Sequence, residues 1–529
     1  MSDHYLPQIN SPADLKQVPL SELPAVCAEL RAEIIEVVSA VGGHLASPLG
    51  AVELAAALHY VFNSPWDRMV WDVGHQAYAH KLLTGRRQRF ATLKQQGGIS
   101  GFCKTQESEH DALTVGHAST SLAAALGMAI ARDLQKEDRE IVAVIGDGGL
   151  TGGMALAALN QLGSQGRKVL VIINDNQMSI SPNVGALKKY LNRARLHPTY
   201  RELMTEVSHF LEHVPFLREG ASRAKDAIKD LLMSHRPFEA WGFEYYGPVN
   251  GHDVIELVKT LQHMRPLKGP TILHALTQKG YGYALAEQDP VKWHSPGLFK
   301  IDTGEVVTSS SYTFSNAFGD ALIELAATDP RVVCITPAMR EGSGLVEFEK
   351  RFPERYVDVG IAEDVAVTCA AGLALRGMRP VVAIYSTFLQ RAYDQVIHDI
   401  ALDNLPVLFC IDRAGLVGAD GPTHHGVFDL SYLRCIPNLA LLAPTNALEL
   451  KEMMRLGLAQ GGPVAIRYPR GNAPRVAQLD TPLAWGKGEV LRRGADLALL
   501  GIGLTVSYAL RAAELLAHQG IRATVVNAR

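Results

Sequence analysis

Two polar clusters in the chain carry groups that could hold a metal ion and a diphosphate. The first is Gly-Asp-Gly-Gly at residues 146–149, and the second is Asn-Asp-Asn at residues 174–176. Asp147 and Asn176 could each offer an oxygen to a hard cation such as Mg2+, which prefers oxygen ligands. The glycines would let the backbone approach phosphate oxygens closely. We therefore expect a metal and diphosphate site built from these two clusters.

The elements around the clusters predict that both lie at one edge of a sheet. Apolar runs at 141–145 and 169–173 indicate buried strands, and the pattern from 151 to 162 indicates a helix between them. Such a βαβ unit places the carboxyl ends of two parallel strands side by side, where open α/β sheets bind ligands. Either cluster alone also fits an ordinary strand-to-helix turn. Together they resemble the diphosphate and metal signature of thiamine-diphosphate enzymes.

The composition indicates a multidomain globular enzyme. The chain has 529 residues, too many for one core, with 47% hydrophobic and 20% charged residues. A net charge of -3 gives no reason to expect nucleic acid or an anionic membrane as a partner. We find no secretory signal, no apolar window of membrane-spanning length and no C-x-x-C pair among the six cysteines. We therefore expect a soluble, cytoplasmic protein with reduced cysteines.

Alternating strand and helix patterns predict an α/β fold with mainly parallel sheets flanked by helices. Linkers near 305–312 and 471–483 divide the chain. Within the first domain, residues 182–241 are predicted to form a mobile helical excursion whose basic cluster is typical of a solvated face. The third domain is expected to be truncated. The predicted domains are 1–307, 308–475 and 484–529.

Several other candidate residues lie at element boundaries. His44 and His75 each lie near glycine, although an isolated histidine is more often structural. Glu363 follows a strand and opens an alanine-rich helix, where the helix dipole alone would favour an acid. The glycine-rich loop at 415–426 carries titratable side chains and could fold over a ligand.

A loop of small residues leads into an alanine-rich helix at 122–131. The small side chains would let this helix pack closely on the sheet. Ser119 or Thr120 is expected to cap its amino end, since hydroxyl side chains are favoured there.

With these clusters in place, the chain resembles the 1-deoxy-D-xylulose-5-phosphate synthases, a family of transketolase-like thiamine-diphosphate enzymes. The resemblance extends over nearly the whole chain and is more specific than the thiamine signature alone. The matching segments are WDVGHQAY at 71–78, GHAST at 116–120, MSIS at 178–181, DVGIAE at 358–363, YSTFLQRAYDQ at 385–395, DRAG at 412–415, GADG at 418–421 and RYPRGN at 467–472.

The resemblance implies consecutive domains of the thiamine-diphosphate-binding type: diphosphate-binding first, pyrimidine-binding second, then a transketolase-type C-terminal domain. It implies thiamine diphosphate and Mg2+ as cofactors and a homodimer as the assembly. The implied reaction condenses pyruvate with D-glyceraldehyde 3-phosphate to give 1-deoxy-D-xylulose 5-phosphate and CO2. This is the first step of the non-mevalonate route to isoprenoid precursors, and it also feeds thiamine and pyridoxal biosynthesis.

The resemblance also implies roles for individual residues. Asp147, Asn176 and the carbonyl of Met178 would hold Mg2+, and Glu363 would bind the pyrimidine ring. The remaining cofactor contacts would be His75, Gly116, His117, Ala118, Gly148, Gly149, Asn176 and Tyr283. The residues implied for proton transfer and the acceptor side are His44, His294, His424, Tyr385, Arg391 and Asp420. The arginines implied for the substrate phosphate are Arg413 and Arg470.

Other interpretations stay open from the residues alone. A transketolase would share the thiamine signature, and consumption of pyruvate with CO2 release would separate the two. A non-catalytic protein could keep the fold, although a pure binder has no need of Asp147, Asn176 and Glu363 together. The two arginines could equally form surface salt bridges. The excursion at 182–241 matches no motif of the family.

Overall fold

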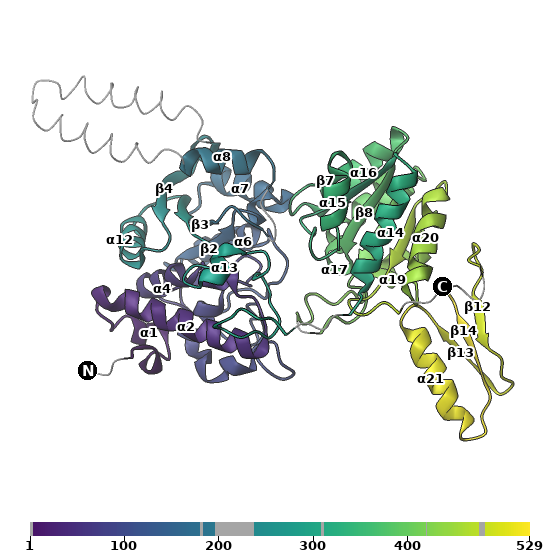
Figure 1. The fold of residues 1–529 in the computed structure, drawn as a ribbon. Helices are drawn as coiled ribbons and strands as arrows, with labels where there is room; N and C mark the ends of the chain where they lie inside the picture. Colours follow the sequence, from purple (N-terminus) through teal and green to yellow (C-terminus); the bar gives the residue numbers. More distant parts are fainter. Residues whose placement is uncertain (1–3, 180–183, 196–236, 308–310, 419, 475–481) are drawn as a thin grey trace, which may run out of the picture. The chain divides into compact units, whose positions relative to one another are not determined.

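The computed structural model describes residues 4–179, 184–195, 237–307, 311–418, 420–474 and 482–529. Most of the predicted excursion at 182–241 lies outside the described residues, so its mobility stays a prediction. The chain separates into two compact units, one of Met1–Leu93 with Gly97–Glu305 and the other of Lys94–Gln96 with Val306–Arg529. We describe each unit by itself (Figure 1).

The first unit is built on a five-stranded parallel sheet with the order β1-β2-β3-β5-β4. Its strands are β1 (Arg68–Trp71), β2 (Ile141–Gly146), β3 (Leu170–Asp175), β4 (Glu244–Asn250) and β5 (Thr271–Leu276). Its α-helices are α1 (Pro12–Leu15), α2 (Leu23–Val41), α3 (Ala46–Leu49), α4 (Val52–Val61), α5 (Tyr78–Lys81), α6 (Ser121–Gln135), α7 (Gly153–Gln165), α8 (Ala186–Arg195), α11 (Pro237–Ala240), α12 (Val254–Met264) and α13 (Ala284–Gln288).

The predicted βαβ unit is confirmed as β2-α7-β3. Strands β2 and β3 pair in parallel and are buried almost throughout, which explains why they read as continuous apolar runs. Helices α6 and α7 pack on these strands through small and branched side chains, including Ala125, Leu159 and Leu162. Strand β3 extends to Asp175, so the second polar cluster begins inside the strand and not after it.

The predicted cap of α6 is confirmed in position but not in its hydrogen bond. Thr120 is the N-cap residue, and its side chain makes no capping hydrogen bond. The carboxylate of Asp72 takes this role: its Oδ1 accepts from the Ser119 N–H at 2.8 Å and its Oδ2 from the Ser121 N–H at 3.1 Å. A carboxylate from a neighbouring strand end thus satisfies amides that have no partner inside the helix.

The second unit contains a six-stranded parallel sheet with the order β10-β11-β9-β8-β6-β7. Its strands are β6 (Val332–Thr336), β7 (Tyr356–Asp358), β8 (Arg379–Tyr385), β9 (Leu408–Asp412), β10 (Ala440–Leu442) and β11 (Val464–Arg467). The accompanying helices are α14 (Phe314–Thr328), α15 (Val346–Arg351), α16 (Glu363–Leu375), α17 (Ser386–Leu389), α18 (Tyr393–Gln395), α19 (Asp429–Leu433) and α20 (Ala447–Ala459).

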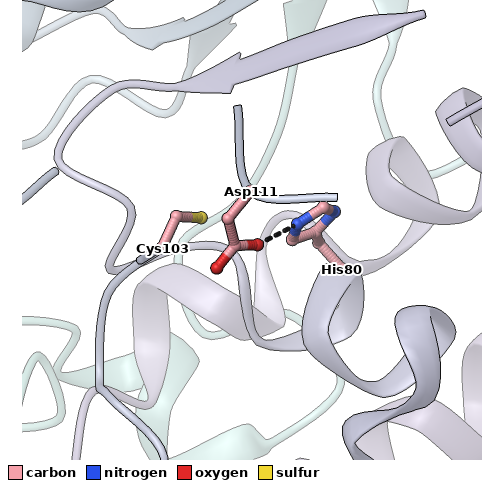
Figure 2. Close-up of side chains that lie close together, drawn as sticks. All are labelled: His80, Cys103 and Asp111. Atoms are coloured by element: carbon pink, nitrogen blue, oxygen red, sulfur yellow. Dashed lines mark hydrogen bonds and ion pairs between the residues drawn. The ribbon is translucent and has the colours of Figure 1, made fainter. Parts of the chain in front are cut away.

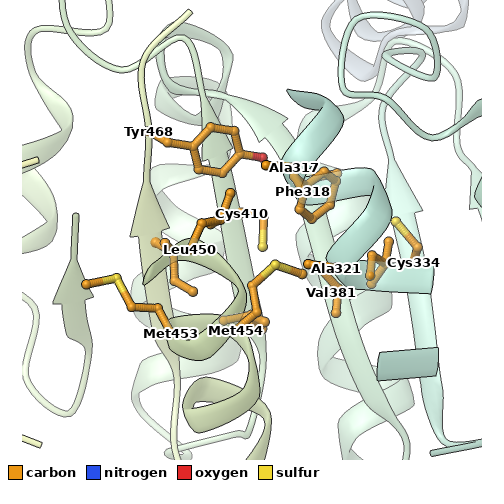
Figure 3. Close-up of a cluster of buried hydrophobic side chains, with 14 of the residues drawn as sticks. Ala317, Phe318, Ala321, Cys334, Val381, Cys410, Leu450, Met453, Met454 and Tyr468 are labelled. Carbon is orange, nitrogen blue, oxygen red and sulfur yellow. The ribbon is translucent and has the colours of Figure 1, made fainter. Parts of the chain in front are cut away.

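Two apolar clusters make up the core of this sheet. One of them contains Phe318 from α14, Met454 from α20, Cys410 from β9 and, at its upper end in the view, Tyr468 (Figure 3). The Tyr468 ring stacks on Phe318 with centroids 6.1 Å apart. The other cluster contains buried alanines of α16, so the helix that carries Glu363 is fixed by close packing.

A smaller sheet with the order β12-β14-β13 completes the second unit. Its elements are β12 (Glu489–Arg492), β13 (Leu497–Gly501), α21 (Thr505–Ala517) and β14 (Ala523–Asn527). Strands β13 and β14 pair in parallel with α21 between them, and β12 pairs antiparallel with β14. No helix in the described ranges is long and apolar enough to cross a membrane.

A buried network of ionic groups fixes the segment that leads to residues 116–118. Asp111 accepts two hydrogen bonds from Arg86, at 2.8 and 3.0 Å, and lies 2.8 Å from His80 Nε2. His80, Asp111 and Cys103 lie close enough together to suggest a metal site (Figure 2). However, His80 Nδ1 also bonds to His59, and Arg86 already supplies the positive charge. The arrangement is therefore a satisfied structural network.

We expect Asp111→Ala to lower the free energy of unfolding by about 3 to 5 kcal/mol, because it leaves the Arg86 guanidinium buried without its main partner. Urea unfolding followed by tryptophan fluorescence would measure the loss. Asp133→Ala is the matched control, since Asp133 pairs with Arg132 and Arg167 at the surface and its removal should cost less than about 1 kcal/mol. Equal effects of the two substitutions would contradict the structural role of Asp111.

Candidate active site

The two polar clusters meet at the carboxyl edge of the first sheet, as predicted. The Asp147 N–H donates to the Asn174 carbonyl at 3.2 Å, and the Gly148 N–H donates to Asp147 Oδ1 at 3.1 Å. Neighbouring strand ends are joined through the Asn174 side chain, which donates to Gln76 Oε1 at 2.8 Å and accepts from the Thr277 hydroxyl. The edge is therefore a hydrogen-bonded corner built from β2, β3, β5 and the turn after β1.

Two acids are buried together in this corner. The side chains belong to Asp147, which is 4% exposed, and Asp175, which is 1% exposed. Burial and the neighbouring Asp175 carboxyl raise the pKa of Asp147 well above its usual range. Within the described residues, Asp147 forms no ion pair with a lysine or arginine. A divalent cation fits this donor set, since it would supply the positive charge that two buried carboxyls need.

Asn176 and Met178 form a turn next to these acids. Asn176 Oδ1 accepts from the Met178 N–H at 3.1 Å, so the two predicted metal ligands are fixed relative to each other. Both line a pocket of about 560 Å³ that Lys279 also borders. The Lys279 ammonium is buried and donates to the Ser179 carbonyl, which anchors the residue after Met178. Lys279, in the loop after β5, is not among the site residues predicted from the sequence.

The two predicted glycine segments are connected through Asp72 and Ser119. The Ser119 hydroxyl donates to the Gly149 carbonyl at 2.6 Å, and Asp72 holds the Ser119 amide. A Cβ at Gly149 would lie 2.7 Å from Asp72 Oδ1, so only glycine fits there. The loop of Gly116, His117 and Ala118, which ends at Ser119, is thereby tied to the turn of Gly148 and Gly149. Exposed backbone amides of such turns can bind phosphate oxygens.

Three histidines form a triangle in the first unit. They are His44 and His294, which the resemblance implies for proton transfer, and His75, which it implies as a cofactor contact. Their ring centroids are 5.5 Å apart for His44 and His75, 5.6 Å for His44 and His294, and 5.7 Å for His75 and His294. The His44 ring also packs edge-on to Phe102 at 5.3 Å, and the Ser47 hydroxyl lies 3.5 Å from His294 Nδ1. We name this group the histidine triangle.

Tyr283 has a different environment. Its hydroxyl donates to the Ile301 carbonyl at 2.7 Å, and its ring packs edge-on against Trp293 with centroids 5.3 Å apart. None of these contacts, within the described residues, reaches the histidine triangle or the glycine segments. The cofactor role of Tyr283 therefore stays a prediction of the resemblance, and the contacts of Tyr283 support a packing role.

In the second unit, Glu363 is the first residue of α16 and its side chain is 2% exposed. Arg391 Nη1 donates to Glu363 Oε2 at 3.0 Å. Burial raises the pKa of Glu363, and the Arg391 guanidinium only partly opposes this shift. The structure thus places together two residues that the resemblance selected separately, and holds a carboxyl that can keep its proton at a higher pH than usual.

Tyr385, Phe388 and His424 form an aromatic stack at the end of β8. The rings of Tyr385 and Phe388 are stacked with centroids 5.6 Å apart, and His424 packs edge-on to Phe388 at 5.5 Å. The Arg413 guanidinium lies 4.2 Å above the Tyr385 ring. Burial raises the pKa of Tyr385 to about 12, so its hydroxyl stays protonated at neutral pH.

The two predicted phosphate arginines differ in how far the protein itself uses them. Arg413 Nη1 donates to Asp412 Oδ2 and to the Gly342 carbonyl, each at 2.6 Å. Arg470 is 52% exposed in its side chain, and the one polar side-chain contact that it makes among the described residues is a long one, 3.4 Å, with Asp420 Oδ2. Arg470 therefore has donors available for a phosphate, whereas Arg413 is committed to an ion pair and to the Tyr385 ring.

Comparison with known protein families identifies all three parts of the chain. Residues 6–277 match the family described as 1-deoxy-D-xylulose-5-phosphate synthase. Residues 310–475 match the pyrimidine binding domain of transketolase, and residues 486–529 match the transketolase C-terminal domain. These families agree with the α/β architecture and the parallel sheets of the structure.

Individual relatives are similar over almost the full chain. A 1-deoxy-D-xylulose-5-phosphate synthase from Thermus thermophilus is 58% identical over 526 residues, which cover 99% of this chain and 85% of the relative. Its counterpart from Thioalkalivibrio sulfidiphilus is 55% identical over 529 residues, covering 99% and 82%. Among solved structures, a transketolase from Campylobacter jejuni overlaps 97% of this chain and 88% of its own at 18% identity and a TM-score of 0.41, which adds nothing to the assignment. On the strength of the sequence matches, the chain belongs to the 1-deoxy-D-xylulose-5-phosphate synthase family.

Proposed function

We propose that this chain is a transferase that condenses pyruvate with D-glyceraldehyde 3-phosphate, releasing CO2 and forming 1-deoxy-D-xylulose 5-phosphate. The named relatives support this function over nearly the whole chain. Among the structural observations, the corner with Asp147, Asn176 and the tied glycine segments supports it most directly. The product would enter isoprenoid precursor biosynthesis.

The family depends on thiamine diphosphate, which supplies a carbon nucleophile for the keto group of pyruvate. We propose Mg2+ as its partner, held by Asp147, Asn176 and the carbonyl of Met178. The amides of residues 116–118 and 148–149, with His75, would bind the diphosphate. The burial of the corner supports this assignment, since charge-assisted hydrogen bonds are stronger where water is excluded.

Glu363 would hydrogen-bond a ring nitrogen of the aminopyrimidine. A carboxyl with a raised pKa can share its proton with a ring nitrogen, and so favours the ring form that acts as a base. The hydrogen bond from Arg391 orients the carboxyl, because it occupies one of the two oxygens. This assignment gives Glu363 a catalytic role and Arg391 a positioning role.

Other residues that the resemblance implies would transfer protons, bind the acceptor or position a neighbouring side chain. His44, His294 and His424 would move protons, since imidazole titrates near neutrality. Tyr385, Asp420 and Arg470 would contact the acceptor aldehyde and its phosphate, and the exposed guanidinium of Arg470 supports the phosphate role. We assign Arg413 the role of positioning Tyr385, because its donors already bind Asp412 and the Gly342 carbonyl and its guanidinium lies over the Tyr385 ring.

We also propose the domain roles that the resemblance implies. Residues 1–307 would bind the diphosphate, residues 308–475 the pyrimidine, and residues 484–529 would belong to the transketolase-type C-terminal domain. A homodimer is proposed as the assembly, on the resemblance alone, and a cytoplasmic location is proposed on the same basis.

The first experiment measures CO2 release from pyruvate with thiamine diphosphate and Mg2+, with and without D-glyceraldehyde 3-phosphate. We expect release to rise sharply when the acceptor is added, together with formation of a five-carbon ketose phosphate. Transfer of two-carbon units between sugar phosphates without CO2 would instead support a transketolase. Absence of both reactions in a chain that binds the cofactor would contradict the proposed function.

We expect Glu363→Gln to lower kcat by about 1000-fold, a typical loss for a group that acts in proton transfer. The substitution keeps the size of the side chain, so the fold should be unchanged. Asp364→Asn is the control, because it removes the adjacent acid and should leave kcat within about twofold of the unaltered chain. Steady-state CO2 release measures both, and near-normal turnover of Glu363→Gln would remove Glu363 from the mechanism.

Arg470→Ala should raise KM for D-glyceraldehyde 3-phosphate by about tenfold and leave KM for pyruvate unchanged, because one charge-assisted hydrogen bond to phosphate is lost. Arg413→Ala is the comparison. It removes a buried partner of Asp412, so we expect a lower unfolding midpoint as well as reduced activity. If Arg470→Ala changed both KM values equally, the phosphate role would be wrong.

A further inference from the structure

A chain of hydrogen-bonding side chains leads from the partly exposed Tyr245 on β4 through the buried His274 on β5 to the buried Asp175 at the proposed metal corner. The Tyr245 hydroxyl lies 2.6 Å from His274 Nδ1, and His274 Nε2 lies 2.9 Å from Asp175 Oδ2. His274 has no exposed surface and its strand neighbours are apolar, so a polar ring is unexpected at this position. We call these side chains the Tyr245–His274–Asp175 chain.

The direction of each hydrogen bond follows from the groups present. A carboxylate can only accept, so His274 Nε2 carries the hydrogen and donates to Asp175. In the neutral tautomer with the hydrogen at Nε2, Nδ1 accepts from the Tyr245 hydroxyl. The hydrogen bond to Tyr245 thus helps to fix the His274 ring, which in turn orients Asp175 Oδ2.

The other side of Asp175 adjoins the proposed metal ligands. Its Oδ1 accepts from the Gln177 N–H at 3.2 Å, in the turn that contains Asn176. Its carboxyl is close enough to Asp147 to raise the pKa of that group. The Asp175 and Asp147 carboxyls are in hydrogen-bond contact. The His274 N–H holds Asp175 Oδ2, so the direction in which Asp175 faces Asp147 and the Asn176 turn depends on His274.

We propose that the Tyr245–His274–Asp175 chain is a positioning device that orients the Asp175 carboxyl, and through it the Asn176 turn and Asp147, for a divalent cation. This inference rests on the proposed metal site and adds the residues that act behind it. Groups that hydrogen-bond next to a metal ligand commonly change metal affinity 10- to 100-fold when removed. His274 and Tyr245 do not touch the cation in this scheme, so they are positioning and not catalytic residues.

The test compares conservative variants of the full chain. Tyr245→Phe removes only the hydroxyl, and we expect it to raise the Kd for Mg2+ by about tenfold. Tyr246→Phe is the matched control: it removes a hydroxyl from the same strand that bonds only to Glu244 among the described residues, and the Kd should not change. Isothermal titration calorimetry with Mg2+ in the presence of thiamine diphosphate measures each Kd.

Two variants of His274 separate its two hydrogen bonds. In His274→Gln the amide nitrogen can occupy the place of Nε2 and donate to Asp175, but the link to Tyr245 is lost, so we expect the Kd for Mg2+ to rise about as much as in Tyr245→Phe. In His274→Asn the amide is too short to reach Asp175, and the Kd should rise by about tenfold or more. Excess Mg2+ should restore kcat in His274→Asn, since only metal binding is impaired.

Unaltered Kd values for both Tyr245→Phe and His274→Asn would overturn the inference. So would a fall in the unfolding midpoint without Mg2+ combined with activity that excess Mg2+ does not restore, because that result indicates a purely structural role. If the unaltered chain itself bound no Mg2+, the proposed metal site would fail and this inference with it. CO2 release by the unaltered chain distinguishes the failure of the inference from the failure of the proposed function.

Discussion

The structure of the first unit depends on the cost of burying two carboxyls at one sheet edge. Asp147 and Asp175 are both buried, where an uncompensated charge would cost several kcal/mol. The protein offsets part of this cost with backbone amides, such as those of Gly148 and Gln177, and with the ring of His274. The cation that we propose, bound with a diphosphate, would offset the remainder.

The glycine segments around this corner are rigid because side chains from several elements hold them. Asp72 caps α6, and Ser119 connects that cap to Gly149. Behind them, Arg86 and Asp111 form a buried ion pair that fixes the segment before residue 116. A binding site made of turns can therefore be as well ordered as one built from strands, since preorganised donors lose little entropy when a phosphate arrives.

The second unit also buries a carboxyl at its proposed site, but a single one. Glu363 is buried at the start of α16, and Arg391 orients it without removing the effect of burial on its pKa. Arg413 lies over Tyr385 and is paired with Asp412. An arginine that the resemblance implies for the substrate phosphate therefore contacts neighbouring side chains of the protein itself. The Arg470 side chain is 52% exposed, which supports our proposal that it binds the substrate phosphate.

Much of this molecule could be predicted from the sequence alone. The β2-α7-β3 unit, the position of Glu363 at a helix start and the proximity of Asp147 to the second cluster follow from local patterns, because hydrophobic period and turn residues determine local structure. The tertiary structure alone decided the cap by Asp72, the histidine triangle, the commitment of Arg413 and the Tyr245–His274–Asp175 chain. Each of these joins side chains from separate strands or loops, and a hydrogen bond between such partners leaves no periodic pattern in the sequence.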